Sequence, residues 1–288
     1  MKSYRGAGTY FTDDHHDGVL TEHEKIDDGR WHHRFGASWL KTTDICLERA
    51  RKEHTHEMPE EESDAACVGT ALHTVIETNL QCELSLADSV DLWHHEFSTL
   101  MQLPSFTWKK YTEEQARRFG EGCVTTFYTQ VLDTIPRECK LETRFVLPFV
   151  EDEHRIIELS GAIDYAWAEG LKDWKSNGSR KYEKWEKQRW DTQATVYTWA
   201  AVMLGLVDYG TVPFEFVVMN AKEAQRVPVT RNWRDWEFLK DKVTHVAELI
   251  EQEVQHWPLN DNHALCSELW CPAWDTCKGK NGLKMKGN

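Results

Sequence analysis

Residues 155–176 read RIIELSGAIDYAWAEGLKDWKS, and this stretch decides the fold. Its first part, residues 155–168, is alternating or β-branched in the manner of a strand, and residues 170–175 continue in the same manner. If Glu169 and Gly170 make a two-residue hairpin loop, the two runs pair as antiparallel strands. The stretch therefore predicts a β-hairpin within a larger sheet.

Three of the charged side chains on this hairpin are candidate site residues. The expected pairing puts Asp164 opposite Lys175 and diagonal to Asp173, so that all three converge on one face. Two carboxylates there suit Mg²⁺ or Mn²⁺, which polarises a phosphodiester and lowers the pKa of an attacking water. The lysine ammonium stabilises developing negative charge. An isolated Asp-x-Lys pattern is more often an ordinary hairpin with a surface salt bridge, so the surrounding sequence has to decide.

Periodicity on both sides of the hairpin indicates further elements. Upstream, the sequence predicts helices at residues 38–52, 67–80, 86–101 and 112–132 and a strand at residues 140–150. Downstream, it predicts a helix at residues 190–204, strands at residues 214–219 and 224–229, and a helix at residues 233–256. This order predicts an α/β fold, with a central sheet flanked by helices.

The clearest of these helices, residues 67–80, carries a second candidate group. His73 and Glu77 are four residues apart and flank its apolar stripe, where the edge of a helix meets a sheet. A histidine at that place completes a metal shell. Taken alone, His73 is more often a partly buried, hydrogen-bonded histidine and Glu77 a solvated neighbour.

Four short motifs follow one another in an order typical of a known family. They are Gly69-x3-His73-x3-Glu77, Gly161-x2-Asp164, Asp173-x-Lys175 and Gln193-x3-Tyr197. Over roughly residues 40–277, the chain resembles the RecB-like branch of the PD-(D/E)XK nucleases. The resemblance implies a restriction-endonuclease-like fold with a central mixed sheet flanked by helices.

The resemblance also implies roles for single residues. His73, Asp164 and Asp173 match the metal ligands, Lys175 matches the catalytic lysine, and Gln193 and Tyr197 match a motif that helps to hold DNA. The i, i+4 spacing of Gln193 and Tyr197 puts both on one helical face; a surface amide beside a core tyrosine is the alternative. The acid here is Asp173 rather than the glutamate of many relatives, which shortens the reach but keeps the charge.

In function, the resemblance implies a Mg²⁺- or Mn²⁺-dependent DNA exonuclease of recombination, repair or end processing. Phage-encoded and CRISPR-associated relatives share this layout, and the expected partner is DNA that has a free end or is single-stranded. One alternative is a structure-specific endonuclease or end-trimming nuclease, and another is a non-catalytic DNA-binding subunit of the same fold. The intact set of Asp164, Asp173 and Lys175 argues against the last. No motif identifies a protein partner.

The cysteines near the C-terminus give a further signal. Cys266, Cys271 and Cys277 are closely spaced, and three thiolates need a fourth ligand. By the resemblance, Cys46 is that ligand, as in relatives whose four cysteines hold a four-iron four-sulfur (4Fe-4S) cluster. A zinc ion or buried thiols are the alternatives. We therefore expect N-terminal helical additions and a C-terminal iron-sulfur clasp on the central fold.

Charge is unevenly distributed along the chain. The formal net charge is -14, and residues 13–28 and 57–64 together carry -11 of it. A local basic surface that captures a phosphate backbone is therefore still possible. Residues 172–189 are such a stretch, with a charge of +4 and interleaved aromatic rings, although a solvated connector is an equal alternative.

The expected domain organisation is a single nuclease domain with an N-terminal arm. Residues 1–36 are polar and aperiodic, which favours a mobile arm; residues 37–288 form the domain, with the cysteine region at 257–288. The sequence shows no span long enough for a membrane and no signal peptide. We expect a cytoplasmic protein, in the host cytoplasm if it is phage-encoded, with no membrane partner.

Overall fold

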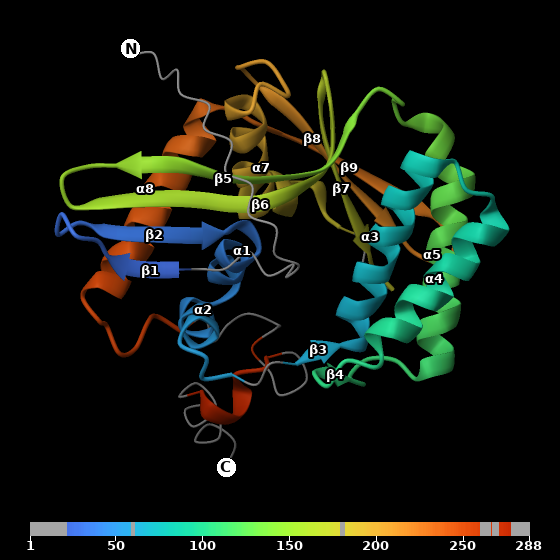
Figure 1. Ribbon diagram of the computed structural model, residues 1–288, viewed down its shortest axis with the longest axis horizontal. Helices are drawn as coiled ribbons and strands as arrows, with labels where there is room; N and C mark the ends of the chain where they lie inside the picture. The colour runs from blue at the N-terminus through green and yellow to red at the C-terminus, as the bar shows by residue number, and fades with distance from the viewer. Residues whose placement is uncertain (1–21, 59–60, 179–181, 260–265, 267–270, 278–288) are drawn as a thin grey trace.

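A computed structural model shows one mixed β-sheet with helices on both faces (Figure 1). It describes residues 22–58, 61–178, 182–259, 266 and 271–277. The mixed sheet and its flanking helices confirm the expected α/β fold class.

Seven strands form the central sheet in the described part of the chain. They are β1 (Glu22–Lys25), β2 (Trp31–Gly36), β5 (Lys140–Glu151), β6 (Arg155–Trp167), β7 (Gly170–Ser176), β8 (Val212–Met219) and β9 (Ala224–Arg231). Their order is β1-β2-β6-β7-β8-β9, and β5 pairs with β6. The β2–β6 and β7–β8 pairs are parallel and the others antiparallel, so the sheet is mixed.

Strand β6 is the central member of the sheet. Along one edge it pairs first with β2, over Arg155–Ser160, and then with β7, over Tyr165–Trp167. Along the other edge it pairs with β5 over most of its length. Strand β7 also pairs with β8, so the β6–β7 hairpin is bordered by β2, β5 and β8.

Helices cover both faces of this sheet. They are α1 (Ala37–Ile45), α2 (Leu47–His54), α3 (Asp64–Cys82), α4 (Leu86–Leu100), α5 (Glu113–Gln130), α6 (Lys184–Trp190), α7 (Thr192–Met203) and α8 (Trp233–Glu251). Two short strands, β3 (Glu62–Ser63) and β4 (Phe106–Thr107), pair with each other, and two 3₁₀ turns, η1 (Leu132–Thr134) and η2 (Trp274–Thr276), complete the elements. No helix among the described residues is long and apolar enough to cross a membrane.

Two hydrophobic cores lie on opposite faces of the sheet. Strand β8 shows why, since Phe216 and Val218 point into one core whereas Val217 and Met219 point into the other. The first core also contains side chains of α1, α7 and α8, and the second contains those of α3, α4 and α5. In Figure 1, α3, α4 and α5 stand together on one side of the molecule, away from α8.

The expected N-terminal arm is wrong for the described residues 22–36. Residues 22–25 and 31–36 form β1 and β2, and β2 joins the sheet beside β6. His33 and Phe35 are fully buried on one face, while Arg34 on the other face is paired with Glu158. The alternation is present, but histidine and arginine conceal it from an argument based on hydrophobicity; residues 1–21 lie outside the described part.

Two helical segments also differ from expectation. The helix expected at residues 38–52 is interrupted at Cys46, whose extended backbone ends α1 and begins α2. Residues 184–190, expected only as part of a charged connector, form α6. The interruption at Cys46 places its thiol at a junction between helices.

After α8, the chain returns to this junction. The backbone N–H of Trp257 donates to Glu48 Oε2 at 2.9 Å, and the N–H of Glu48 donates to the carbonyl of Pro258 at 3.3 Å. In Figure 1, the red ribbon near the C-terminus lies below α2. The C-terminal segment and the α1–α2 junction are therefore neighbours.

Candidate functional site

The β6–β7 hairpin brings together the acids expected to face each other. The expected register is wrong by one residue on each strand, because the loop is Ala168–Glu169 and Tyr165 pairs with Lys172. Continuing this ladder places Asp164 opposite Asp173 rather than opposite Lys175. Both carboxylates still lie on one face, as predicted.

Asp164 and Asp173 are both buried, at 8% and 0% exposure. Asp164 Oδ2 accepts a hydrogen bond of 2.9 Å from the backbone N–H of Trp174. Burial and the nearby Asp173 carboxylate raise the pKa of Asp164, although His73 and Lys175 oppose the shift. Two buried carboxylates that repel each other favour a cation beside them.

Lys175 lies against Asp173. Its Nζ is 2.7 Å from both carboxylate oxygens, but the geometry is that of a hydrogen bond only for Oδ1, and Oδ2 is buried without a hydrogen-bond partner. Burial alone lowers the pKa of Lys175, but the carboxylates of Asp173 and Asp164 outweigh it and raise the pKa above its ordinary value. Lys175 therefore stays positively charged.

Helix α3 supplies a ligand-type nitrogen. His73 Nε2 lies 2.7 Å from the carbonyl oxygen of Trp174, and a nitrogen that bonds to a carbonyl carries the proton. In the neutral imidazole, the lone pair is then on the other ring nitrogen, Nδ1, which lies 3.6 Å from Asp164 Oδ2. The hydrogen bond to β7 thus fixes the tautomer that metal binding requires.

Glu142, on β5, is a site residue that the sequence did not reveal. One ligand atom from each of Glu142, His73 and Asp164 lies within 4.8 Å of the others, and among the described residues no other set of three does so. Burial and the Asp164 carboxylate raise the pKa of Glu142 to about 7. In the β5–β6 ladder, Glu142 lies opposite Asp164. Asp173 adjoins this group, but is not within its 4.8 Å.

Helix α7 carries the last predicted pair. Gln193 Nε2 donates to the Tyr197 hydroxyl at 3.0 Å, so the two side chains meet on one helical face. Burial, together with the Asp164 and Asp173 carboxylates, raises the pKa of Tyr197. A Cβ at Gly161 would lie only 2.9 Å from the Tyr197 ring, so the glycine of the second motif makes room for this tyrosine.

A second lysine, also missed from the sequence, lies beside this pair. Lys41 on α1 donates from Nζ to Gln193 Oε1 at 3.3 Å and lies 3.9 Å from Asp191 Oδ2. A hydrogen-bonded row, Lys41–Gln193–Tyr197, therefore runs from α1 to a tyrosine close enough to the carboxylates for them to raise its pKa. No motif includes Lys41, so only the packing of α1 on α7 shows it.

The predicted cysteine ligands lie partly in the described chain. Burial raises the pKa of the Cys271 thiol, and Cys277 and Cys46 raise it further, which shows that the three sulfurs are electrostatic neighbours. Among the described residues, no three of these four sulfurs lie within 4.8 Å of one another. The expectation of a clasp stays a prediction.

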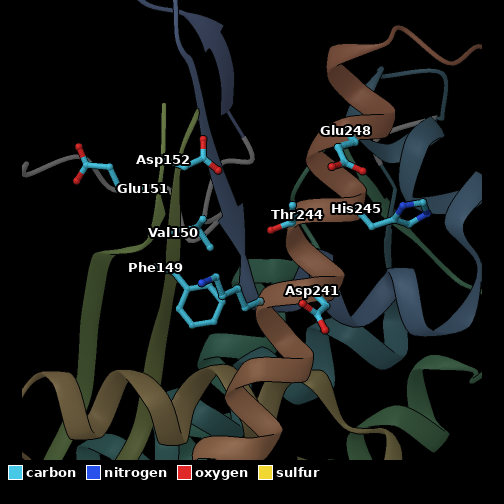
Figure 2. A pocket seen from close by; sticks show the side chains of 9 residues that line it. Phe149, Val150, Glu151, Asp152, Asp241, Thr244, His245 and Glu248 are labelled. Atoms are coloured by element: carbon cyan, nitrogen blue, oxygen red, sulfur yellow. The ribbon is translucent and has the colours of Figure 1, made fainter. Parts of the chain in front are cut away.

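A hollow of about 570 Å³ lies elsewhere, between the β5–β6 turn and α8 (Figure 2). Glu151, Asp152, Asp241 and Glu248 line it, and none of the predicted site residues does. Glu151 and Glu248 are paired with arginines at 3.1 and 3.5 Å. We place the functional site at the hairpin, where buried acids, an imidazole and a lysine converge.

Comparison with known proteins concerns most of the chain. A family model described as "PD-(D/E)XK nuclease superfamily" matches residues 34–278 and so includes every residue of the hairpin site. No curated protein matches the chain. A solved structure described as "Crystal structure of SSO0001" is similar at 11% identity and a TM-score of 0.39, over 86% of this chain and 87% of that one.

Proposed function

Because the chain belongs to the PD-(D/E)XK nuclease superfamily, a superfamily of metal-dependent nucleases, we propose that it is a DNA exonuclease that uses Mg²⁺ or Mn²⁺. The observation that carries this proposal is the convergence of Asp164, Asp173 and Lys175 on the β6–β7 hairpin. A binding module has no need for two buried, mutually repelling acids beside a lysine.

The side chains present fit a hard divalent cation. Asp164 and Glu142 offer carboxylate oxygens, His73 offers a nitrogen, and the buried Oδ2 of Asp173 has no hydrogen-bond partner. Carboxylates suit Mg²⁺ and Mn²⁺, and the imidazole favours Mn²⁺ over Mg²⁺. We propose His73, Asp164 and Asp173 as ligands, with Glu142 as a further one. When bound, the cation supplies Lewis-acid polarisation of the phosphodiester and a lowered pKa for the attacking water.

The chain's own residues do the remaining work. Lys175 holds a fixed positive charge, because its pKa is raised, and this charge stabilises negative charge that develops on the phosphate. Gln193 and Tyr197 position the strand beside the acids, since their hydrogen-bonded pair lies next to the carboxylates. Cleavage from an end is proposed from the resemblance of the motif set to RecB-like exonucleases.

We also propose that Cys46, Cys266, Cys271 and Cys277 hold a 4Fe-4S cluster. The proposal is supported by the neighbouring positions of Cys46, Cys271 and Cys277 and by the hydrogen bonds that join Trp257 and Pro258 to α2. Soft thiolates suit iron-sulfur chemistry, whereas the hairpin site offers hard oxygens. The two sites are therefore chemically independent.

A cleavage assay on end-labelled linear DNA and on covalently closed circular DNA tests the function. We expect Mg²⁺ or Mn²⁺ to support loss of nucleotides from the linear substrate only. Asp173→Asn and Lys175→Met should each lower the rate by about 100-fold or more, because each removes a charge needed in the transition state.

Matched changes outside the site control for folding. Asp241→Asn and Lys240→Met remove the same charges from α8 and should leave the rate unchanged. Full activity of Asp173→Asn or Lys175→Met would overturn the site assignment. Cleavage of the closed circle would replace the exonuclease with an endonuclease.

A further inference from the structure

Lys41 is a charged group that the proposed chemistry does not use. It stands on α1, far in sequence from the hairpin, yet it shares electrostatic surroundings with Lys175 and Asp173. The N-terminal end of α7 lies beside it, through Asp191 and Gln193. Lys41 therefore lies next to the proposed DNA-holding pair without a role in the proposed chemistry.

The position of Lys41 is fixed by a network on the same helix. One turn further along α1, Asp44 accepts from the Thr192 hydroxyl at 2.9 Å and from the Thr192 backbone N–H at 3.3 Å. Lys242 of α8 also pairs with Asp44 and donates to Thr192 Oγ1 at 2.9 Å. Helix α1 is therefore bound to the start of α7, and Lys41 is held over Gln193.

Lys41 shares its nearest carboxylate with a second lysine. Its only carboxylate within ion-pair distance among the described residues is Asp191, at 3.9 Å. That carboxylate already accepts from Lys187 Nζ at 2.6 Å and caps the N–H of Ala194 at 3.0 Å. Two ammonium groups thus share one acid.

Burial, together with the charges of Lys175 and Lys187, lowers the pKa of Lys41 to about 8 despite the opposing carboxylate of Asp191. An arriving anion would favour the charged form. The side chain is still 32% exposed, so such an anion can reach it from solvent. The carboxylate that Lys41 shares with Lys187 and the partial exposure of its side chain both favour an anionic ligand.

We propose that Lys41 binds a non-reacting phosphate of the DNA strand, next to the phosphate that is cut. This inference rests on the proposed nuclease function and assigns one backbone contact of the substrate. The row Lys41–Gln193–Tyr197 leads from this phosphate to the carboxylates, so the strand lies along α7 with one lysine at each of two phosphates. A lysine acts here as a point charge and reads no base.

DNA binding as a function of salt concentration tests the proposal. Binding of a labelled oligonucleotide is measured by fluorescence anisotropy in EDTA, which prevents metal-dependent cleavage. Lys41→Gln and Lys41→Met should weaken binding by roughly tenfold and lower the slope of log Kd against log salt concentration by about one. Lys41→Arg should keep the wild-type slope, and Lys240→Gln on α8 serves as the matched control.

The outcomes separate this inference from the nuclease assignment. An unchanged salt slope in folded Lys41→Gln and Lys41→Met, as judged by thermal unfolding, overturns the inference even if the wild type cuts DNA. A wild-type protein that shows the Lys41-dependent slope but no cleavage with Mg²⁺ or Mn²⁺ keeps the inference and overturns the nuclease. A wild-type protein that binds no DNA overturns the inference, and one that also cuts no DNA overturns both.

Discussion

Glu142 holds an unusual backbone conformation within strand β5, with φ at 42°. A residue with a Cβ pays about 1–2 kcal/mol for the left-handed region. The ladder continues on both sides of it, through Leu141–Tyr165 and Thr143–Ile163. Because this strained conformation holds the Glu142 carboxylate near Asp164, it indicates that the carboxylate has a functional role.

Glu142→Gln tests that role with two readouts of opposite sign. An amide oxygen is a weaker ligand than a carboxylate, so the Mg²⁺ concentration for half-maximal cleavage should rise roughly 10- to 100-fold. Without metal, the variant should be more stable than the wild type, because one of the repelling buried acids is gone. Metal titration of cleavage and urea unfolding in EDTA measure the two effects.

The matched control is Glu138→Gln, an exposed acid just before β5. It should change neither the metal dependence nor the stability. If Glu142→Gln changes neither the metal dependence nor the stability, Glu142 does not bind the metal.

At the scale of elements, the hairpin was predictable because its two strands are adjacent in sequence. Its register was not, because Gly170 was interpreted as a turn residue. A Cβ at Gly170 would lie 2.7 Å from the carbonyl oxygen of Pro213, so this glycine permits close approach of β8. Glycine is used both in tight turns and where another strand comes close, and only the position of β8 shows which use applies to Gly170.

Glu142 and Lys41 could not be predicted for a related reason. The carboxylate of Glu142 faces Asp164 through the β5–β6 register, and Lys41 reaches Gln193 through the packing of α1 on α7. Neither relation leaves a periodic signal in the sequence. His73, Asp164 and Lys175 could be predicted because their spacing repeats a family motif on single elements.

Three imidazoles join β1, β2 and α2. His23 Nδ1 and His33 Nδ1 are 2.8 Å apart, the rings of His23 and His54 are 4.4 Å apart, and His33 Nε2 bonds to Glu251 of α8 at 2.9 Å. Burial lowers the pKa of each imidazole, and that of His23 falls to about 2. The folded protein keeps all three neutral at neutral pH.

This cluster predicts a loss of stability in mild acid. In the unfolded chain these histidines take up protons below about pH 6.5, whereas in the folded chain they take them up only at lower pH. The unfolded state then binds more protons, so the free energy of unfolding falls as pH drops from about 7 to 5. Urea unfolding at several pH values measures the slope.

The change His54→Phe keeps a ring in contact with His23 and removes one titrating group. Unfolding of this variant should take up as much as one proton fewer, so its slope of unfolding free energy against pH should be smaller. His154→Phe removes a histidine whose side chain is 70% exposed and serves as the control. Parallel slopes for the wild type and His54→Phe would contradict the expectation.

At the scale of the whole molecule, the proposed clasp would join the two ends of the described chain. Cys46 lies between α1 and α2, and Cys271 and Cys277 lie beyond α8. Because no preformed site exists in the unfolded chain, cluster binding becomes folding energy. We expect anaerobically purified protein to be brown and to contain iron and inorganic sulfide.

Cys271→Ser should lose this colour and become sensitive to proteolysis. Asp173→Asn should stay brown, because the hairpin site and the cysteines are separate. Cys123→Ser is a matched control, since this buried thiol of α5 lies in the second hydrophobic core and not among the C-terminal cysteines. Stoichiometric zinc without iron would replace the cluster with a zinc site and leave the nuclease assignment standing.

The place of β2 beside β6 has a consequence for how the molecule is made. On the ribosome, β2 emerges roughly 120 residues before its partner, a delay of about 6–24 s at ordinary rates of synthesis. During that time, β2 can pair with β1, but its other edge, which β6 later covers, stays open. The nascent chain therefore exposes the open edge of the β1–β2 pair early, where another strand or a chaperone can bind before β6 is made.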